Sequence, residues 1–199
     1  MNPETHPPES LTHRLTALHG QAHRRYHTQA HVDALLGWLD HYRSLAIAPA
    51  LIEAAIWFHD AVYDPQRADN EERSAVLAER ELSALGWPEA KVLAVAAMVR
   101  ATQRHEATED DADTRLFLDF DLSILGQSPA RYGAYRDAIR NECAWVDDAR
   151  YREGRCRVLQ AFAAREHIYF TPALRVAWEA IARRNVAEEL AELARGGER

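Results

Sequence analysis

The chain has 199 residues, of which 47% are hydrophobic, and it carries a formal net charge of -7 at pH 7. This size and hydrophobic content are typical of one well-buried domain, so we expect a single domain over residues 1–199, with residues 1–9 flexible. The negative charge excludes a general nucleic-acid or anionic-membrane surface, because sequence-independent phosphate binding needs clustered excess cations. Local arginines are still able to hold a small anionic ligand.

The sequence also bears on the cellular setting. It contains two cysteines, Cys143 and Cys156, which are too few for a disulfide framework and lack the paired spacing of a zinc ribbon. Residues 1–8 lack the apolar core of a signal peptide, and no apolar run approaches the ~20 residues of a membrane span. We therefore expect a cytoplasmic protein that is not inserted in a membrane.

Helical signals recur from one end of the chain to the other, and alternating strand patterns of any length do not occur, which predicts an all-α fold. The predicted helices cover residues 10–20, 28–44, 49–60, 71–85, 88–103, 116–125, 129–145, 148–165 and 172–195. Their ends come from local capping chemistry. The expected start signals are Ser10, Pro49, Asp69 or Asn70, Pro88, Ser128-Pro129 and Thr171-Pro172, and the expected stop signals are Gly86, Gly126 and Gly196-Gly197. The acidic stretch 106–113 is expected to be a solvated loop.

The histidines near the second predicted helix differ in their expected environments. His27 and His31 lie four residues apart, and Leu35 and Leu39 continue their row along the apolar face of helix 28–44. This spacing aims at least His31 toward the interior, whereas His27 is either a ligand or the partner of a ligand. Four further histidines are expected to be solvated surface side chains, namely His13, His19, His23 and His41.

A His-Asp pair ends the apolar helix predicted at 49–60. Ile52, Ile56 and His59 follow helical core spacing, and Asp60 falls four residues after Ile56, so both members of the pair border the buried face. Burying imidazole and carboxylate groups costs free energy unless they have a partner such as a hydrogen bond or a metal ion. A divalent cation needs several such ligands from different segments. The pair therefore predicts part of a metal site.

A later acidic residue completes the predicted set of ligands. If residues 116–125 form a helix with about 100° per residue, Asp121 points to the middle of the arc formed by the apolar side chains. Asp119 falls instead on the polar side, near Arg115 and Ser123, where a carboxylate is ordinarily solvated. We therefore choose Asp121 as the last ligand.

These four residues, His31, His59-Asp60 and Asp121, resemble the signature of the HD superfamily of metal-dependent phosphohydrolases, in which a His, a His-Asp pair and a later Asp ligate the metal. Further segments resemble one branch, the small stand-alone bacterial proteins catalogued as predicted HD-domain phosphohydrolases. These segments are residues 26–28, 57–64, 69–75, 118–126, 168–171 and 182–185. The resemblance implies a single-domain helical bundle of the HD-domain type.

The resemblance also implies how the site is built. His31, His59, Asp60 and Asp121 would hold one divalent ion, for which iron, manganese, cobalt, nickel, zinc and magnesium are the candidates. The substrate-binding candidates are Arg25, Asn70, Glu71, Arg104 and His105.

Two residues are the candidates for catalysis. Asp64 lies one helical turn beyond Asp60 and is able to accept or orient a proton of a metal-activated water, and His27 is the second candidate. Some relatives carry a Glu at the position of Tyr63, so the resemblance does not fix the general base.

The implied activity is hydrolysis of a phosphate ester, in particular a small nucleotide-like phosphomonoester. A bound divalent ion lowers the pKa of coordinated water to roughly 7 and polarises a phosphoryl oxygen, so one centre supplies nucleophile and electrophile. The expected partner is therefore a small phosphorylated molecule. Among Arg24, Arg25, Arg100 and Arg104, Arg25 is our first choice to neutralise its phosphate group.

Two other functions fit the same residues. A metal is able to tie helices together in a non-enzymatic ligand-binding or regulatory module. HD proteins with extra histidines between the His-Asp pair and the final Asp include diiron oxygenases, but His105 is the one such histidine here, which favours a single metal. The amphipathic helix predicted at 172–195 is either domain core or the surface of a homodimer.

Overall fold

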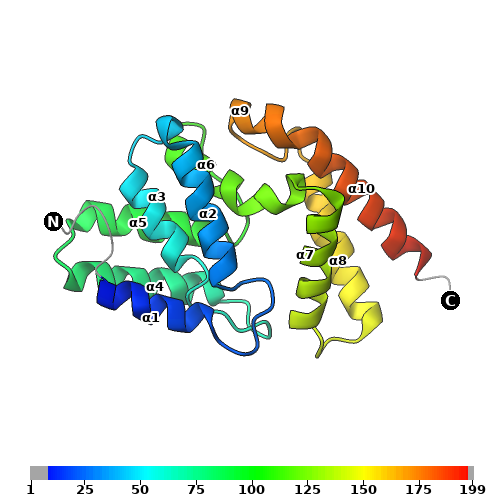
Figure 1. Ribbon diagram of the computed structural model, residues 1–199, viewed down its shortest axis with the longest axis horizontal. Helices are drawn as coiled ribbons and strands as arrows, with labels where there is room; N and C mark the ends of the chain where they lie inside the picture. The colour runs from blue at the N-terminus through cyan, green and yellow to red at the C-terminus, as the bar shows by residue number, and fades with distance from the viewer. Residues whose placement is uncertain (1–8, 197–199) are drawn as a thin grey trace. The chain divides into compact units, whose positions relative to one another are not determined.

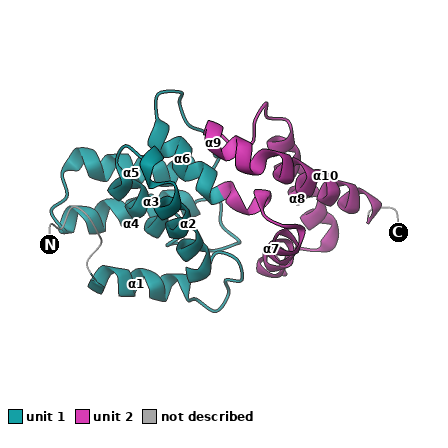
Figure 2. Ribbon diagram, turned by 45° about the horizontal axis from the view of Figure 1, so that its top comes forward, with its two compact units in different colours: residues 1–121 teal, residues 122–199 magenta. Residues whose placement is uncertain are grey.

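The computed structural model describes residues 9–196, so the predictions for residues 1–8 and Gly197 lie outside the described part. All regular elements in this part are helices, which confirms the predicted all-α fold (Figure 1). The chain divides into two compact units, Met1–Asp121 and Leu122–Arg199 (Figure 2). The expectation of one domain over the whole chain stays a prediction.

Unit 1 consists of helices joined by short loops. Its elements are α1 (Glu9–His19), α2 (Gln29–His41), the 3-10 helix η1 (Arg43–Leu45), α3 (Pro49–Phe58), α4 (Asn70–Ala84), α5 (Glu89–Ala101) and α6 (Ala112–Asp121). Pro49 begins α3 as predicted, because the N–H group that proline lacks has no partner in a first helical turn. Gly86 follows α4 with φ of +77°, a conformation that glycine adopts without strain. Ser10 lies inside α1, and Pro88 precedes α5 instead of being its first residue.

Helix α3 is the centre of the core of unit 1. Five of its residues have no exposed surface, namely Ile52, Ala54, Ala55, Ile56 and Phe58. Helices α2, α4, α5 and α6 all pack against it, as expected for a helix that is apolar all round. The His-Asp pair that follows this helix therefore lies in the interior of the unit.

The acidic stretch 106–113 is not wholly a solvated loop, because α6 begins at Ala112 and Asp113 is buried. The two carboxylate oxygens of Asp113 accept hydrogen bonds from the backbone N–H groups of Ile47 at 2.8 Å and Ala48 at 2.7 Å. Ala48 is the N-cap residue of α3, where free N–H groups and the helix dipole favour a negative charge. Asp113 therefore anchors the start of α6 to the start of α3.

Unit 2 is helical as well. Its elements are the 3-10 helix η2 (Leu122–Gly126), α7 (Pro129–Glu142), α8 (Asp148–Ala163), α9 (Pro172–Leu174), a π-helical segment (Arg175–Glu179) and α10 (Ala180–Arg195). The predicted helix 116–125 is thus two elements, because the α-helix ends at Asp121 and continues as a 3-10 helix. The predicted start signals Ser128-Pro129 and Pro172 hold, and the Ser128 side chain accepts a hydrogen bond from the N–H of Arg131.

A buried ionic cluster joins three helices of unit 2. Arg155 donates to both carboxylate oxygens of Glu189, at 2.8 and 3.1 Å, and Tyr132 donates its hydroxyl to Glu189 at 2.5 Å. The guanidinium of Arg155 also donates to the hydroxyl of Tyr135 at 2.9 Å. Arg155 and Glu189 are 8% and 2% exposed, so solvent hardly contacts this ion pair and each charge is stabilised mainly by the other.

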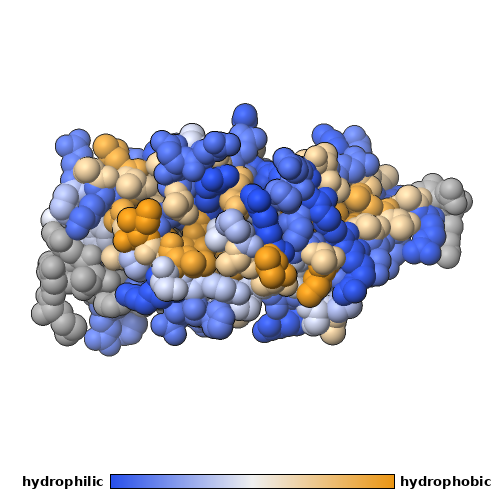
Figure 3. Space-filling view, turned by 90° about the horizontal axis from the view of Figure 1, so that it is seen from above, coloured by the Kyte–Doolittle hydropathy of each residue, from blue (hydrophilic) through white to orange (hydrophobic). Residues whose placement is uncertain are grey.

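The surface mixes polar and apolar side chains. Figure 3 shows hydrophobic residues interspersed with hydrophilic ones on the face drawn.

No helix within residues 9–196 has both the length and the apolar character needed to cross a membrane.

Candidate metal centre

Three helix ends of unit 1 meet at the predicted metal site. His31 lies in the first turn of α2, His59 is the C-cap residue of α3 with Asp60 next to it, and Asp121 is the last residue of α6. Each of these helices is fixed by its own buried face. The fold therefore brings together side chains from three distant parts of the sequence.

The ligand atoms of these side chains point at one another. The Nε2 atoms of His31 and His59 lie 3.1 Å apart, and Asp121 Oδ1 lies 3.2 Å from the first and 3.7 Å from the second. Asp60 Oδ2 approaches the same place, at 3.1 Å from His59 Nε2 and 3.9 Å from His31 Nε2. His31, His59 and Asp121 each offer one ligand atom within 4.8 Å of the other two.

These separations fit ligands that share one cation. Two atoms at about 2.1 Å from a metal ion lie about 3.0 Å apart at a right angle and about 3.4 Å apart at a tetrahedral angle. The separations between the two imidazole nitrogens, and between each of them and the carboxylate oxygens, run from 3.1 to 3.9 Å, at or slightly above this range. Asp60 lies outside the group of His31, His59 and Asp121, whose ligand atoms all lie within 4.8 Å of one another. Two imidazole nitrogens with two carboxylates suit iron, manganese, cobalt, nickel or zinc. The donor set is therefore compatible with the divalent ion expected from the sequence.

The ring of His59 is oriented by its own helix. Its Nδ1–H donates a hydrogen bond of 2.8 Å to the carbonyl oxygen of Ile56. This bond places the hydrogen of the neutral ring on Nδ1 and leaves the lone pair on Nε2, the atom that faces His31 and Asp60. Histidines that bind metals are commonly held by such a partner, which fixes the tautomer.

Burial and neighbouring charges shift the pKa values of the cluster. Burial by itself lowers the pKa of His59, but the carboxylates of Asp60 and Asp121 outweigh it and raise this pKa to about 9. Burial lowers the pKa of His31, and Asp121 opposes this effect only in part. Burial by itself would raise the pKa values of the two carboxyl groups, but His59 lowers that of Asp60, and His105 and His31 lower that of Asp121. Positive charge is thus favoured between the two carboxylates.

Two further titratable side chains lie near Asp60. The ring centroid of His27 is 6.1 Å from that of His31, and the charge of His27 helps to lower the pKa of Asp60. Glu71, in the first turn of α4, is half-buried, and burial raises its pKa. Asp60 raises this pKa further, whereas His105 and His27 lower it. The ring contact with His31 places His27 beside the cluster, and the charge of Asp60 acts on Glu71 at the start of α4.

Asp64 and Asn70 form hydrogen bonds within the loop between α3 and α4. The carboxylate of Asp64 accepts a hydrogen bond of 2.9 Å from the backbone N–H of Gln66. The side chain of Asn70 accepts from the N–H of Asp64 at 3.0 Å and donates to the carbonyl oxygen of Asp64 at 2.8 Å. The catalytic role predicted for Asp64 and the substrate contact predicted for Asn70 stay predictions.

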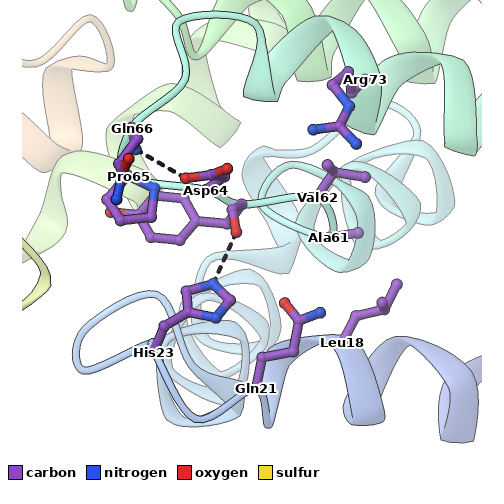
Figure 4. Close-up of a pocket in the computed structure, with 10 residues that line it drawn as sticks. Leu18, Gln21, His23, Ala61, Val62, Asp64, Pro65, Gln66 and Arg73 are labelled. Atoms are coloured by element: carbon purple, nitrogen blue, oxygen red, sulfur yellow. Dashed lines mark hydrogen bonds between the residues drawn. The ribbon is translucent and has the colours of Figure 1, made fainter.

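Asp64 also lines a pocket with a volume of about 590 Å³ beside this loop (Figure 4). His23 and Arg73 also line this pocket, and the Nε2–H of His23 donates to the carbonyl oxygen of Tyr63 at 2.9 Å. None of the four predicted metal ligands lines this pocket. The pocket is therefore separate from the cluster, although it adjoins the segment that follows the His-Asp pair.

Arg24 has a structural role that the sequence did not reveal. It is 3% exposed and donates hydrogen bonds to the carbonyl oxygens of His27 at 2.9 Å, Asp60 at 2.7 Å and Ala61 at 3.2 Å. A guanidinium used in this way does not bind a phosphate group. Arg24 instead ties the loop before α2 to the turn that carries Asp60.

The other arginines considered for phosphate binding lie in different surroundings. Arg100 forms ion pairs with Glu72 at 2.7 Å and Glu79 at 2.8 Å, so its guanidinium already has two carboxylate partners. Arg25 is exposed and donates to carbonyl oxygens of its own loop. Arg104 is exposed in the turn after α5. Phosphate binding by Arg25, Arg100 and Arg104 stays a prediction.

Two buried polar residues contradict the expectation that they are solvated. His19 is 1% exposed, its Nε2–H donates to the carbonyl oxygen of Trp57 at 3.1 Å, and burial lowers its pKa to about 4. Asp119 is 0% exposed. A signal for His19 was present in the sequence, because Leu11, Leu15 and His19 recur every four residues and share one helix face.

Comparisons with protein-family models, with curated proteins and with solved structures found no match to this chain. The resemblance to the HD superfamily therefore rests on the residues of the chain itself. The function has to be inferred from the cluster.

Proposed function

We propose that this protein is a metal-dependent phosphohydrolase acting on a small phosphorylated molecule, with one divalent ion held by His31, His59, Asp60 and Asp121. The observation that carries the proposal is the convergence of two imidazole Nε2 atoms and two carboxylates from three helix ends. Buried charged groups gathered in this way are stabilised by a shared cation. The resemblance of the same residues to the HD superfamily supports the phosphate-ester class.

The exposure of the four side chains supports catalysis over a purely structural site. The side chains of His31 and His59 are 4% and 1% exposed, whereas those of Asp60 and Asp121 are 16% and 14% exposed. The imidazoles thus form the closed side of the cluster and the carboxylates the accessible side. Catalytic sites keep an open coordination position, whereas structural metal sites are saturated and closed.

When bound at this cluster, a divalent ion supplies a Lewis acid for a phosphoryl oxygen and lowers the pKa of coordinated water to about 7. We infer that His27 or Glu71 accepts the proton of the attacking water, because the ring of His27 contacts that of His31 and the charge of Asp60 acts on Glu71. The pKa of Glu71 is raised by burial, which moves its carboxyl group toward the range in which a general base is effective at neutral pH. Asp64 is a weaker candidate, since its carboxylate caps Gln66.

The proposal is tested by measuring phosphate release after metal removal and reloading. Chelated protein is reconstituted separately with Mn²⁺, Fe²⁺, Co²⁺, Ni²⁺, Zn²⁺ or Mg²⁺ and assayed against nucleoside monophosphates and other phosphomonoesters. We expect activity with at least one ion, a metal content of one per chain, and loss of activity in Asp121→Ala. Asp40→Ala is the matched control, because Asp40 is an exposed carboxylate on α2.

The same experiment separates the alternatives. Full activity of Asp121→Ala would reject the mechanism. Two irons per chain together with oxygen consumption would favour an oxygenase. One tightly bound ion without activity on the whole panel would favour a non-enzymatic module.

A further inference from the structure

His105 has an unusual backbone conformation. Among the non-glycine residues from Glu9 to Gly196, it is the one with a positive φ, +50°. Its backbone N–H donates to the carbonyl oxygen of Ala101 at 2.8 Å, which closes the turn after α5. Glycine adopts this left-handed conformation without a steric penalty, and histidine does not. The local backbone therefore gives no reason for a histidine at this position.

The side chain of His105 supplies a reason. Its Nε2 lies 2.9 Å from Oδ2 of Asp121, and the two side chains are 19% and 14% exposed. An ionised carboxylate only accepts hydrogen bonds, so His105 donates through Nε2–H. This assigns the hydrogen of His105 to the nitrogen that faces Asp121. In that state Nε2 has no lone pair for a metal ion.

The two oxygens of Asp121 consequently have different partners. Oδ1 faces the Nε2 atoms of His31 at 3.2 Å and His59 at 3.7 Å, whereas Oδ2 faces His105. A carboxylate held by its outer oxygen has a fixed rotation and presents its inner oxygen to the centre of the cluster. Hydrogen bonds of this kind orient metal ligands, and their removal commonly lowers metal affinity about 10–100-fold.

We propose that His105 is a positioning residue that holds the Asp121 carboxylate so that one oxygen, Oδ1, is presented to the ion. This inference rests on the proposed metal site. It gives His105 a role different from the substrate contact expected from the sequence. It also explains the strained turn, because a glycine there would relieve the backbone and lose the donor.

Three variants separate the hydrogen bond from the backbone strain. His105→Gln keeps an N–H donor at a similar reach and keeps the strain, His105→Leu removes the donor at the same strain, and His105→Gly removes both. Binding of Co²⁺ and Zn²⁺ to chelated protein is measured by calorimetry, and the thermal midpoint of the metal-free protein is measured in parallel. The visible spectrum of bound Co²⁺ reports whether the coordination geometry changes.

We expect affinity close to wild type for His105→Gln and about 10–100-fold weaker binding for His105→Leu and His105→Gly, with an altered Co²⁺ spectrum in both. The metal-free Gly variant should have a higher thermal midpoint than the Leu variant, although the two variants lose metal affinity to a similar extent. Wild-type affinity in the Leu and Gly variants would overturn the proposal, as would an equal loss in the Gln and Leu variants. Failure of the wild-type protein to bind any ion would instead reject the metal site itself.

Discussion

Gly126 and Trp178 approach so closely that a Cβ atom added at Gly126 would lie 2.5 Å from the Cβ atom of Trp178. The hydroxyl oxygen of Tyr169 would lie 3.0 Å from the same added atom. Tyr169 is buried and donates its hydroxyl to the carbonyl oxygen of Leu122 at 3.0 Å. Within unit 2, glycine at position 126 is therefore required by packing, in addition to ending a helix as expected from the sequence.

Gly126→Ala should lower the free energy of unfolding by about 1–3 kcal/mol, because the added methyl group overlaps a side chain that is held on a helix. Gly133→Ala is the matched control, since an added Cβ there has no atom within 4 Å and Gly133 lies inside α7. That variant should be more stable by about 0.5–1 kcal/mol. Urea denaturation measures the free energy of unfolding of both variants. Equal effects of the two substitutions would contradict the packing argument.

Glu189→Gln should destabilise the protein by about 3–5 kcal/mol, because it leaves the buried guanidinium of Arg155 without a carboxylate. Glu188→Gln, at an exposed position next to it, should change stability by less than about 0.5 kcal/mol. Thermal unfolding of the two variants gives the comparison. A small effect at Glu189 would mean that Tyr132 and Tyr135 suffice to hold Arg155.

His19 should make stability depend on pH in mildly acidic solution. Its pKa is about 4 in the folded protein, lowered by burial, and about 6.5 in the unfolded chain. The unfolded state therefore binds more protons between these values, so the contribution of His19 is fully present above about pH 6.5 and is lost as the pH falls toward 4. Protonation would also bury an Nδ1–H group whose nitrogen has no partner among the described residues.

His19→Gln is the variant that isolates this contribution, because its amide is able to donate to the carbonyl oxygen of Trp57 and does not titrate. Between pH 7 and pH 5, the wild-type protein should lose about 2 kcal/mol more unfolding free energy than the variant. Urea unfolding at the two pH values measures the difference. Identical losses in the two proteins would show that His19 is not buried in its neutral form.

Metal removal should lower the thermal midpoint. An ion that binds only the folded state adds about 2.7 kcal/mol when its free concentration is 100 times the dissociation constant. Addition of a chelator should therefore reverse the stabilisation, and Asp60→Asn should reduce it, because the Asp60 carboxylate lies 3.1 Å from His59 Nε2. A midpoint that does not respond to ions would argue against the cluster as a metal site.

The sequence predicted helix ends best, because a helix end depends on the chemistry of a few neighbouring residues. Pro49, Gly86 and Ser128 mark helix ends correctly, because missing N–H groups, positive φ and side-chain caps act within one turn. The pattern of the apolar residues likewise predicted the helices of both units. The π-helical segment at Arg175–Glu179 has no such local signal.

The choice between Asp119 and Asp121 shows the limit of this approach. Asp121 does lie with His31 and His59, but the argument that Asp119 is solvated was wrong, since Asp119 is completely buried. The argument assumed that the polar side of this helix faces solvent. Asp119 lies within the regular α-helix Ala112–Asp121, but every residue from Leu116 to Phe120 is buried, so this end of the helix has no solvated side.

Buried polar residues were the larger source of error, because their partners come from distant segments. Arg24 bonds to the carbonyl oxygens of Asp60 and Ala61, and Asp113 bonds to N–H groups at the start of α3. Backbone partners leave no mark in the sequence, since every residue type carries the same carbonyl and N–H groups. Such contacts became visible only with the fold.

The two contacts at the ends of α6 fix the position of this helix along α3. Asp113 is bonded to Ile47 and Ala48 before α3, and Asp121 faces His59 after it, about 12 Å further along the axis of α6. Sliding of one helix along the other would break both contacts at once. Amide hydrogen exchange at Ile47 and Ala48 should therefore slow when an ion is captured at the opposite end, although neither amide touches it.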